Sequence, residues 1–449
     1  MLASLVVDFN SFFASVEQQL DVSLRGKPVG VVPVIAETTS CIAASIEAKK
    51  FGIKTGTGVR EARALYSDII FVLASHEKYV AVHEKAVEAV DRILPVKQVM
   101  SIDEMECEVP KRFQTREHAT RLAALVKKEI LSTVGDQLQT SIGVAPNTML
   151  AKLASDMMKP NGLVIIEQHE IHEKLKNLKL RDLTGVGKRM LIRLNDCGIH
   201  SMPDLLAAPR DLLHTAWGGV AGDEMYDKLR GVPYGPRKTE SRSLGHSHML
   251  PPEMRNPTDA FAVLNRLTQK AAMRLRKQGF YATALSLSVR MDPRGMAGYQ
   301  GSSSAPMGGH RETRLGETQD TATLLHALDL LWHSGLHLLA RPKAVGMLLH
   351  GLVPVSQHTP GLFDAPDRLA QAEPAQEAAS SQASHTSKTQ SDIKTHAVPK
   401  DRSQLMSAMD GVNRRYGKSA LYFATAHGAL DHAPMRIAFN RIPDIETER

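Results

Sequence analysis

The chain contains little cysteine, no long apolar run and no leader-like start. Only three of its 449 residues are cysteine, Cys41, Cys107 and Cys197, and they stand far apart in the sequence. This spacing gives neither a disulfide framework nor a zinc motif, so we expect a reducing environment. No apolar run is long enough to cross a bilayer, and no basic leader region precedes the first strand pattern. The sequence therefore predicts a soluble, cytoplasmic protein that does not act at a membrane.

The size and charge of the chain allow several domains and a nucleic-acid surface. Its 449 residues are enough for roughly two to four domains, and 43% of them are hydrophobic. The formal net charge is +7. An excess of this size is compatible with a surface that binds nucleic acid, but it does not require one.

The opening third alternates strand and helix patterns, which predicts an α+β or α/β fold with acidic residues at strand ends. Apolar runs predict strands at residues 2–7, 30–35 and 140–145. Helical spacing predicts helices at residues 12–20, 43–51, 78–94, 116–134 and 148–158.

Two acidic fragments carry the main chemical signal. Asp8 ends an apolar run, and the adjacent Asp103 and Glu104 stand at the tip of a predicted hairpin. If the fold brings them together, three hard oxygen ligands surround one point, which suits Mg²⁺ with substrate phosphates completing its shell. The alternative is a solvated strand end and an ordinary turn, and for either fragment alone that alternative is the better interpretation. Three acids around two metal ions would suit nucleotidyl transfer.

Aromatic and basic residues accompany the acids. Phe12 and Phe13 follow Asp8 closely. An aromatic ring beside a nucleotide sugar can exclude a ribose 2′-OH by contact, so we assign Phe13 to such a gate and Phe12 to core packing. Lys49 and Lys159 are candidates for contacts with a triphosphate, although a single lysine is more often simply solvated.

The sequence pattern changes near residue 183, where a glycine-containing turn precedes basic residues. Gly185 and Gly187 form a Gly-x-Gly turn that is followed by Lys188 and Arg189. We expect a helix-hairpin-helix, because glycines let backbone N–H groups approach a phosphate and the next helix start adds positive potential. The alternative is an αα-hairpin that needs a tight turn.

The remaining chain predicts a small sheet domain, a linker and a C-terminal segment. Residues 237–248 indicate a polar tether, and the patterns that follow favour a β-α-β-β-α-β order ending at residue 353. Residues 354–403 have the composition of a disordered linker. One apolar pair, Leu362 and Phe363, lies near its start and could bind a partner's groove.

Several of these motifs, in this order, resemble the Y-family translesion DNA polymerases, and the resemblance covers roughly residues 1–355. The motifs are Asp8-x-Asn10-x-Phe12-Phe13, Glu47-Ala48-Lys49-x-Phe51-Gly52, Ser101-Ile102-Asp103-Glu104, Ser141-Ile142-Gly143-Val144-Ala145-Pro146-Asn147 with Leu150-Ala151-Lys152-Leu153-Ala154-Ser155-Asp156, and Lys159-Pro160-Asn161-Gly162. The hairpin at Thr184 to Lys188 matches the same family.

The resemblance implies a right-hand polymerase and assigns its parts. Residues 1–165 would form palm and fingers, 166–236 a helical thumb, 237–355 a little finger, 356–403 a linker with a clamp peptide, and 404–449 a segment like the C-terminus of UmuC. It implies two Mg²⁺ ions held by Asp8, the Phe9 backbone carbonyl, Asp103 and Glu104, a steric gate at Phe13, and triphosphate contacts from Phe12, Lys49 and Lys159. DNA contacts would come from Gly185, Gly187, Lys188 and Arg189, and clamp contacts from Leu362 and Phe363.

The function implied is low-fidelity DNA synthesis past damaged bases, as part of the SOS response. The partners implied are primed template DNA and dNTPs, with a sliding clamp and a UmuD-like subunit or recombinase filament as further candidates. Asn10 and Lys49 resemble the UmuC branch, whereas Ser155-Asp156 and Lys159-Pro160 resemble polymerase IV. Two departures, Ile46 and Thr148, replace residues that commonly are Tyr and Lys in the family, which affects the expected affinity for nucleotide.

Two other functions compete with this interpretation. A non-catalytic polymerase relative would bind DNA and the clamp as an adaptor, but such relatives are expected to lack the three acids. A metal-dependent nuclease with a helix-hairpin-helix would not need a Phe-Phe pair beside its first carboxylate.

Overall fold

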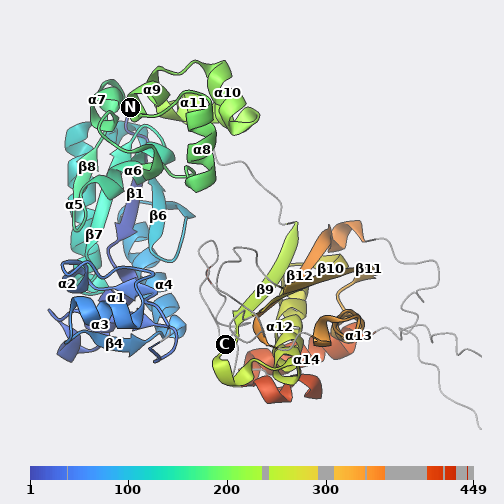
Figure 1. Cartoon of the computed structure of the whole chain (residues 1–449). Coiled ribbons are helices and arrows are strands. Elements are labelled where there is room, and N and C mark those ends of the chain that lie inside the picture. Colours follow the sequence, from blue (N-terminus) through green and yellow to red (C-terminus); the bar gives the residue numbers. More distant parts are fainter. Residues whose placement is uncertain are drawn as a thin grey trace, which may run out of the picture. The chain divides into compact units, whose positions relative to one another are not determined.

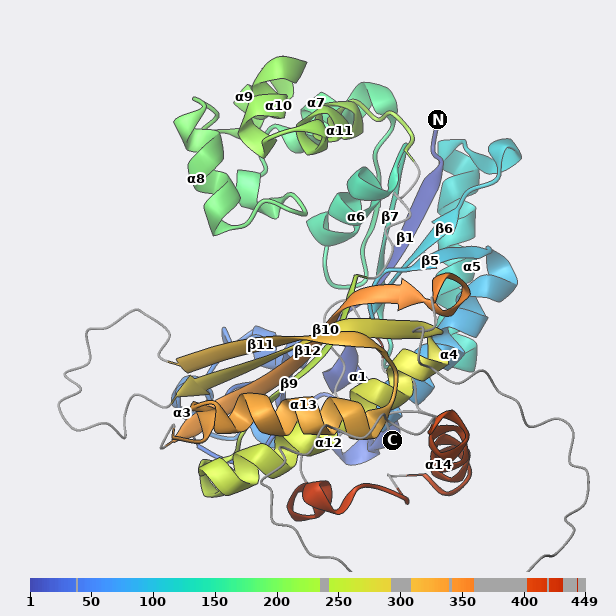
Figure 2. The same ribbon diagram turned by 90° about the vertical axis from the view of Figure 1, so that its right-hand side faces the viewer.

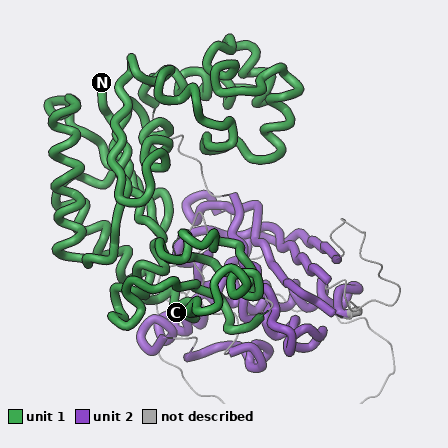
Figure 3. The backbone as a smooth tube through the Cα atoms, turned by 60° about the vertical axis from the view of Figure 1, so that its left-hand side comes forward, with its two compact units in different colours: residues 1–238, 435–445 green, residues 239–434, 446–449 purple. Residues whose placement is uncertain are grey.

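The computed structural model describes residues 1–37, 39–234, 242–291, 308–338, 341–358, 402–417, 420–430 and 442. The chain divides into two compact units, and each is described by itself (Figure 3). The first unit comprises residues 1–238 with 435–445, and the second comprises residues 239–434 with 446–449. The five-part division into palm and fingers, thumb, little finger, linker and C-terminal segment stays a prediction.

A five-stranded sheet with the order β5-β6-β1-β7-β8 lies at the centre of the first unit (Figure 1). The central strand β1 is buried along its whole length and pairs antiparallel with both β6 and β7. Strands β5 and β6 pair antiparallel, which confirms the hairpin predicted to carry the acid pair. The strands are β1 (Ser4–Phe9), β5 (Val96–Val99), β6 (Glu104–Glu108), β7 (Thr140–Ala145) and β8 (Leu163–Ile165).

Helices cover both faces of this sheet. Leu5 and Val7 of β1 point into a core shared with α1, α4 and α5, whereas Val6 points into a core shared with α6. This division follows from the strand period of two, which sends neighbouring side chains to opposite faces. These helices agree with the predicted ranges within two residues at each end. They are α1 (Phe12–Leu20), α4 (His76–Ile93), α5 (Arg116–Thr133) and α6 (Thr148–Met157).

Gly143 in β7 allows α6 to lie directly on the sheet. A Cβ atom at this position would be 2.0 Å from the Ala151 carbonyl oxygen and 2.4 Å from the Ser155 nitrogen. We therefore expect Gly143→Ala to lower the free energy of unfolding by about 3 kcal/mol, because backbone would have to move. Urea unfolding followed by circular dichroism measures this loss. Gly58→Ala is the matched control, since its nearest atom is 4.0 Å away, and equal stability of the two variants would contradict the prediction.

A second, smaller sheet has the order β3-β2-β4. The predicted helix over residues 43–51 is wrong in its first part. Ala43 and Ala44 instead pair with Val31 and Gly30 as a short strand, and Ser45 then caps the following helix by accepting a hydrogen bond from the Ala48 N–H. The elements are β2 (Val29–Val32), β3 (Ala43–Ala44), α2 (Ile46–Lys49), α3 (Val59–Leu65) and β4 (Ile70–Leu73).

Five short helices complete the described part of the first unit. Their apolar faces join the core that packs under α6. They are α7 (Ile171–Leu175), α8 (Lys188–Asp196), α9 (Met202–Ala207), α10 (Arg210–Trp217) and α11 (Val220–Leu229).

The second unit is a four-stranded antiparallel sheet with the order β11-β10-β12-β9, and α12 and α13 lie against one face (Figure 2). The β-α-β-β-α-β order is confirmed, but the tether predicted over 237–248 is wrong from residue 243 onward. Leu244 and His248 are buried while Ser243, Ser247 and Met249 are exposed, so β9 is a half-buried strand. The elements are β9 (Ser243–Met249), α12 (Pro257–Lys277), β10 (Phe280–Met291), β11 (Gly308–Thr318), α13 (Thr321–His333) and β12 (Pro342–Pro354).

The described residues 402–417 and 420–430 contact α12. Helix α14 (Ser403–Tyr416) is joined to α12 by an ion pair. Both carboxylate oxygens of Asp410 in α14 accept hydrogen bonds from the Arg276 guanidinium in α12, at 2.7 and 2.8 Å. The Gln269 side chain makes two hydrogen bonds to the Phe423 backbone, and Ala429 is fully buried in the core of the second unit. Most of the predicted linker, with Leu362 and Phe363, lies outside the described residues.

In the described part of the chain, no helix has the length and apolar character that crossing a membrane requires.

Candidate active site

The two acidic fragments meet at one end of the central sheet. Asp8 in β1 stands directly opposite Glu104 in β6, and the Phe9 N–H donates to the Asp103 carbonyl at 2.8 Å. After β1 the chain turns sharply into α1 at Ser11, whose φ of 53° lies in the left-handed region. Such a conformation costs energy in a residue with a side chain and is found preferentially at functional sites. The three predicted acids therefore share one site.

Two lysines from the α6 region contact these acids. The Lys152 ammonium lies 2.5 Å from Asp8 Oδ2 and 2.9 Å from Glu104 Oε1. The Lys159 ammonium lies 2.8 Å from the same Asp8 oxygen, and both lysines also contact Asp156. Burial opposes the charged form of each lysine, but the carboxylates outweigh it and raise the pKa of both.

The carboxylates affect one another. Burial raises the pKa of Asp103; the hydrogen bond from Ser101 Oγ, at 2.6 Å, opposes that rise, and the charge of Asp8 adds to it. Burial also raises the pKa of Glu104, against the attraction of Lys152. Acids that resist ionisation in this way need a nearby cation to stay charged together.

The donor set fits a hard divalent cation in its chemistry. All three side chains offer carboxylate oxygens, which Mg²⁺ prefers. Asp8 and Glu104 lie on adjacent strands, and Asp103 directly precedes β6. Their present arrangement is different, because Lys152 lies between Asp8 and Glu104 while Asp103 is turned to Ser101. Across the described residues, no three acidic, histidine or cysteine side chains are gathered closely enough to hold a metal ion as they stand.

Phe12 and Phe13 have the two environments that the sequence predicts. Phe12 is 3% exposed and belongs to the core, so its side chain is not available to a ligand. Phe13 is only partly buried and stacks on Tyr79 with ring centroids 4.4 Å apart. The Tyr79 hydroxyl in turn donates to buried Glu17 at 2.7 Å. The Phe13 ring therefore has a fixed aromatic support.

The charges of Asp8, Asp103 and Lys159 act on Lys49, which lies in α2. Burial lowers its pKa, the positive charge of Lys159 lowers it further, and Asp8 and Asp103 act in the opposite direction. Two ammonium groups that repel each other suit a common anionic ligand.

The predicted Gly-x-Gly turn precedes α8, and the four residues assigned to it are exposed. Gly185 has a φ of +94°, and a Cβ atom at Gly185 or Gly187 would meet nothing within 4 Å. Lys188 and Arg189 form the first turn of α8. The segment before the turn is a 3-10 helix, Leu180–Asp182, rather than an α-helix. The backbone of the turn is open to a ligand.

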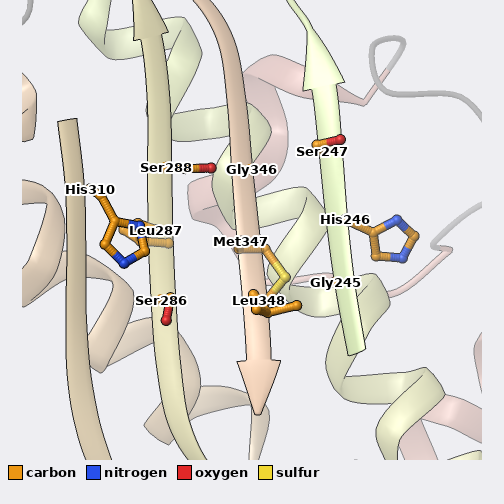
Figure 4. A pocket seen from close by; sticks show the side chains of 10 residues that line it. All are labelled: Gly245, His246, Ser247, Ser286, Leu287, Ser288, His310, Gly346, Met347 and Leu348. Atoms are coloured by element: carbon orange, nitrogen blue, oxygen red, sulfur yellow. The ribbon is translucent and has the colours of Figure 1, made fainter. Parts of the chain in front are cut away.

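The second unit has a hollow on the sheet face away from its helices (Figure 4). Its volume is about 320 Å³, and its floor contains small residues where neighbouring strands pair. Because glycine and serine side chains fill little space, they leave a shallow depression in the surface of the sheet. The lining residues on these strands include Gly245, Ser247, Ser286, Ser288, His310 and Gly346.

We predicted no role for Lys152 from the sequence. Its ammonium group nevertheless contacts three acidic side chains, those of Asp8, Glu104 and Asp156. A usable signal was present, because Lys152 and Asp156 are four residues apart and therefore share one face of α6. Tyr79 was also missed, since nothing in a helical pattern distinguishes a ring that supports another aromatic from ordinary core.

Comparisons with known proteins show the family to which the chain is related. Residues 7–156 match the impB/mucB/samB family, and residues 241–362 match its C-terminal domain. The DNA polymerase IV of Moorella thermoacetica is 32% identical over 82% of this chain and 90% of its own length. The DNA polymerase IV of Pelotomaculum thermopropionicum is 33% identical over 64% of this chain and 72% of its own length.

Solved structures with 22–23% identity show the same fold. A Y-family DNA polymerase chimera of Dbh and Dpo4 superposes with a TM-score of 0.66, over 79% of this chain and all of that chain. DinB from Sulfolobus solfataricus superposes with a TM-score of 0.50, over 78% of this chain and 98% of that chain. The prediction of an α+β right-hand polymerase fold is confirmed, and the relatives favour the polymerase IV side of the resemblance over the UmuC side. The chain belongs to the impB/mucB/samB family and is a Y-family DNA polymerase of the DinB-like bacterial branch.

Proposed function

We propose that this chain copies damaged DNA by two-metal nucleotidyl transfer at the site formed by Asp8, Asp103 and Glu104. The observation that carries the proposal is that Asp8, near the end of β1, lies beside Asp103 and Glu104, where β6 begins, close to a partly buried aromatic ring and three lysines. The non-catalytic adaptor is not favoured, because all three acids are present and the relatives are polymerases.

Family membership implies dependence on a divalent metal, and the proposal specifies two Mg²⁺ ions. Asp8, Asp103, Glu104 and the Phe9 backbone carbonyl would hold them. Bound there, the ions would favour ionisation of the primer 3′-hydroxyl and offset the charge that develops on the departing pyrophosphate. The acids would supply the negative charge that holds the ions, and the pairing of β1 with β6 fixes the positions of the Asp8 and Glu104 backbones.

The triphosphate of the incoming nucleotide would lie among Lys49, Lys159 and the start of α1. Lys49 and Lys159 repel each other, so a polyanion between them relieves that repulsion. Phe12 would contribute its backbone N–H, because the first turn of a helix has N–H groups without intrahelical partners. Phe13 would lie against the sugar. With Ile46 in place of a tyrosine, α2 offers no side-chain hydroxyl to the phosphates at that position.

Primed template DNA would be held mainly through its phosphates. Gly185, Gly187, Lys188 and Arg189 offer an open backbone and two cations, and the lowered sheet face of the second unit offers a second surface. Contacts of this kind carry no sequence information, which suits a polymerase that must accept any template.

The polymerase would also act with accessory proteins, and it would do so in the cytoplasm. A sliding clamp would bind through Leu362 and Phe363, and a UmuD-like subunit or a recombinase filament would act with the polymerase in the cytoplasm. These partners would bring the enzyme to stalled replication.

Primer extension on templates with and without an abasic site tests the proposed function. Purified protein, dNTPs and Mg²⁺ are expected to lengthen the primer on both templates. Intact DNA binding without extension would favour the adaptor, and a shortened primer would favour the nuclease.

A further inference from the structure

We infer that the Lys152 ammonium group is a built-in counter-cation of this site, which holds Asp8 and Glu104 together and must leave before a divalent ion can bind both. This inference rests on the proposed function, because it concerns the metal site of that function. In this role Lys152 positions the two acids.

The position of Lys152 is the first argument. Its ammonium group contacts Asp8 Oδ2 at 2.5 Å and Glu104 Oε1 at 2.9 Å, and only 12% of its side chain is exposed. The oxygens that it contacts belong to two of the three side chains that would hold metal. A cation therefore already bridges the two strands at the point where the acids converge.

The charge of the site is the second argument. Three carboxylates lie close together with little solvent, and such groups repel one another unless a cation is present. Among the described residues, Lys159 pairs with Asp8 and Asp156 rather than with Glu104, and 37% of its side chain is exposed. Lys152 is thus the cation that joins the acid of β1 to the acid of the hairpin.

Asp156 provides a place for the displaced lysine. It lies one turn further along α6, and one of its oxygens is 3.0 Å from the Lys152 ammonium. Its side chain is 41% exposed, so it stands at the outer side of the cluster. A lysine has a long, flexible stem. Lys152 can therefore release Asp8 and Glu104 and keep an acidic partner, while Asp103 would turn away from Ser101.

The inference predicts stronger metal binding when the lysine charge is removed. In nucleotide-free protein, Lys152→Met is expected to bind Mn²⁺ at least about tenfold more tightly than the unmutated protein, because one competing cation is gone. Electron paramagnetic resonance of free Mn²⁺ measures this without relying on activity. In EDTA the same variant is expected to melt at a lower temperature, and Mg²⁺ is expected to raise its melting temperature more than that of the unmutated protein.

Matched variants separate the inference from its alternatives. Lys152→Arg keeps the charge and is expected to keep weak Mn²⁺ binding, and Lys128→Met removes an exposed lysine of α5 and is expected to change nothing. Equal Mn²⁺ affinity in Lys152→Met and the unmutated protein would overturn the inference. If Asp8→Asn leaves Mn²⁺ binding unchanged, the metal site itself is wrongly placed and the proposed function fails with it.

Discussion

Glu104→Gln is expected to lower the rate of nucleotide insertion by more than about a hundredfold, since even residues that only orient a metal ligand commonly account for losses of that size. Glu104 opens β6 directly opposite Asp8, so its carboxylate cannot be replaced by a neighbour without shifting the strand register. Glutamine keeps the size of the side chain and removes its charge. The substitution therefore tests the electrostatic role and leaves the shape of the site almost unchanged.

The measurement is single-nucleotide insertion at saturating dNTP, with primed DNA binding recorded in parallel. Glu108→Gln is the matched control, because Glu108 ends the same strand and its side chain is exposed. Activity of Glu104→Gln close to that of the control would remove Glu104 from the catalytic centre. Loss of DNA binding in Glu104→Gln would show that the variant acts through the fold rather than the chemistry.

Phe13→Ala is expected to raise ribonucleotide insertion relative to deoxyribonucleotide insertion by about 10- to 100-fold, the factor that corresponds to roughly 1.4 to 2.8 kcal/mol of steric cost. The Phe13 ring is stacked on Tyr79, and Glu17 fixes the Tyr79 hydroxyl. Because this support prevents the ring from moving aside, a 2′-OH at the sugar position would meet a rigid surface. Removing the ring removes that contact.

Competition between rNTP and dNTP at one template position measures this ratio. Phe51→Ala provides the control, since Phe51 is a 43% exposed aromatic residue of the same unit. An unchanged sugar preference in Phe13→Ala, with normal dNTP insertion, would contradict the assignment of the gate.

The acids were predictable because their signal is local. An apolar run that ends in Asp8 and a hairpin with Asp103 and Glu104 at its tip each place a carboxylate at a strand end, whatever the rest of the fold does. The sequence alone could not show that the two acidic fragments lie side by side. The pairing of β1 with β6 places Asp8 opposite Glu104 and so confirms it.

Other features depend on contacts between distant segments. Ala43 and Ala44 have good helix propensity, yet they pair with β2, because tertiary contacts override a weak local preference. Strand β9 has only one fully apolar buried position near its start, so its polar sequence resembles a tether until β12 is placed beside it.

Thr148 contacts a buried carboxylate that lies far from it in the sequence. Its hydroxyl donates to Glu106 Oε1 at 2.6 Å, and Lys97 of the neighbouring strand supplies a positive charge to the same oxygen at 3.2 Å. Lys97 and Thr148 are 51 positions apart in the sequence. No periodicity argument links them, and only the packing of α6 on the sheet brings them to one carboxylate.

The most direct test of the central claim is the stoichiometry of the reaction at the Asp8, Asp103 and Glu104 site. Primed DNA with one template position, the matching dNTP and Mg²⁺ are incubated with the protein, and the products are counted. The account predicts one pyrophosphate released for each primer lengthened by one nucleotide, and neither product with Glu104→Gln. Bound DNA that yields no pyrophosphate, or a primer that becomes shorter, would contradict it.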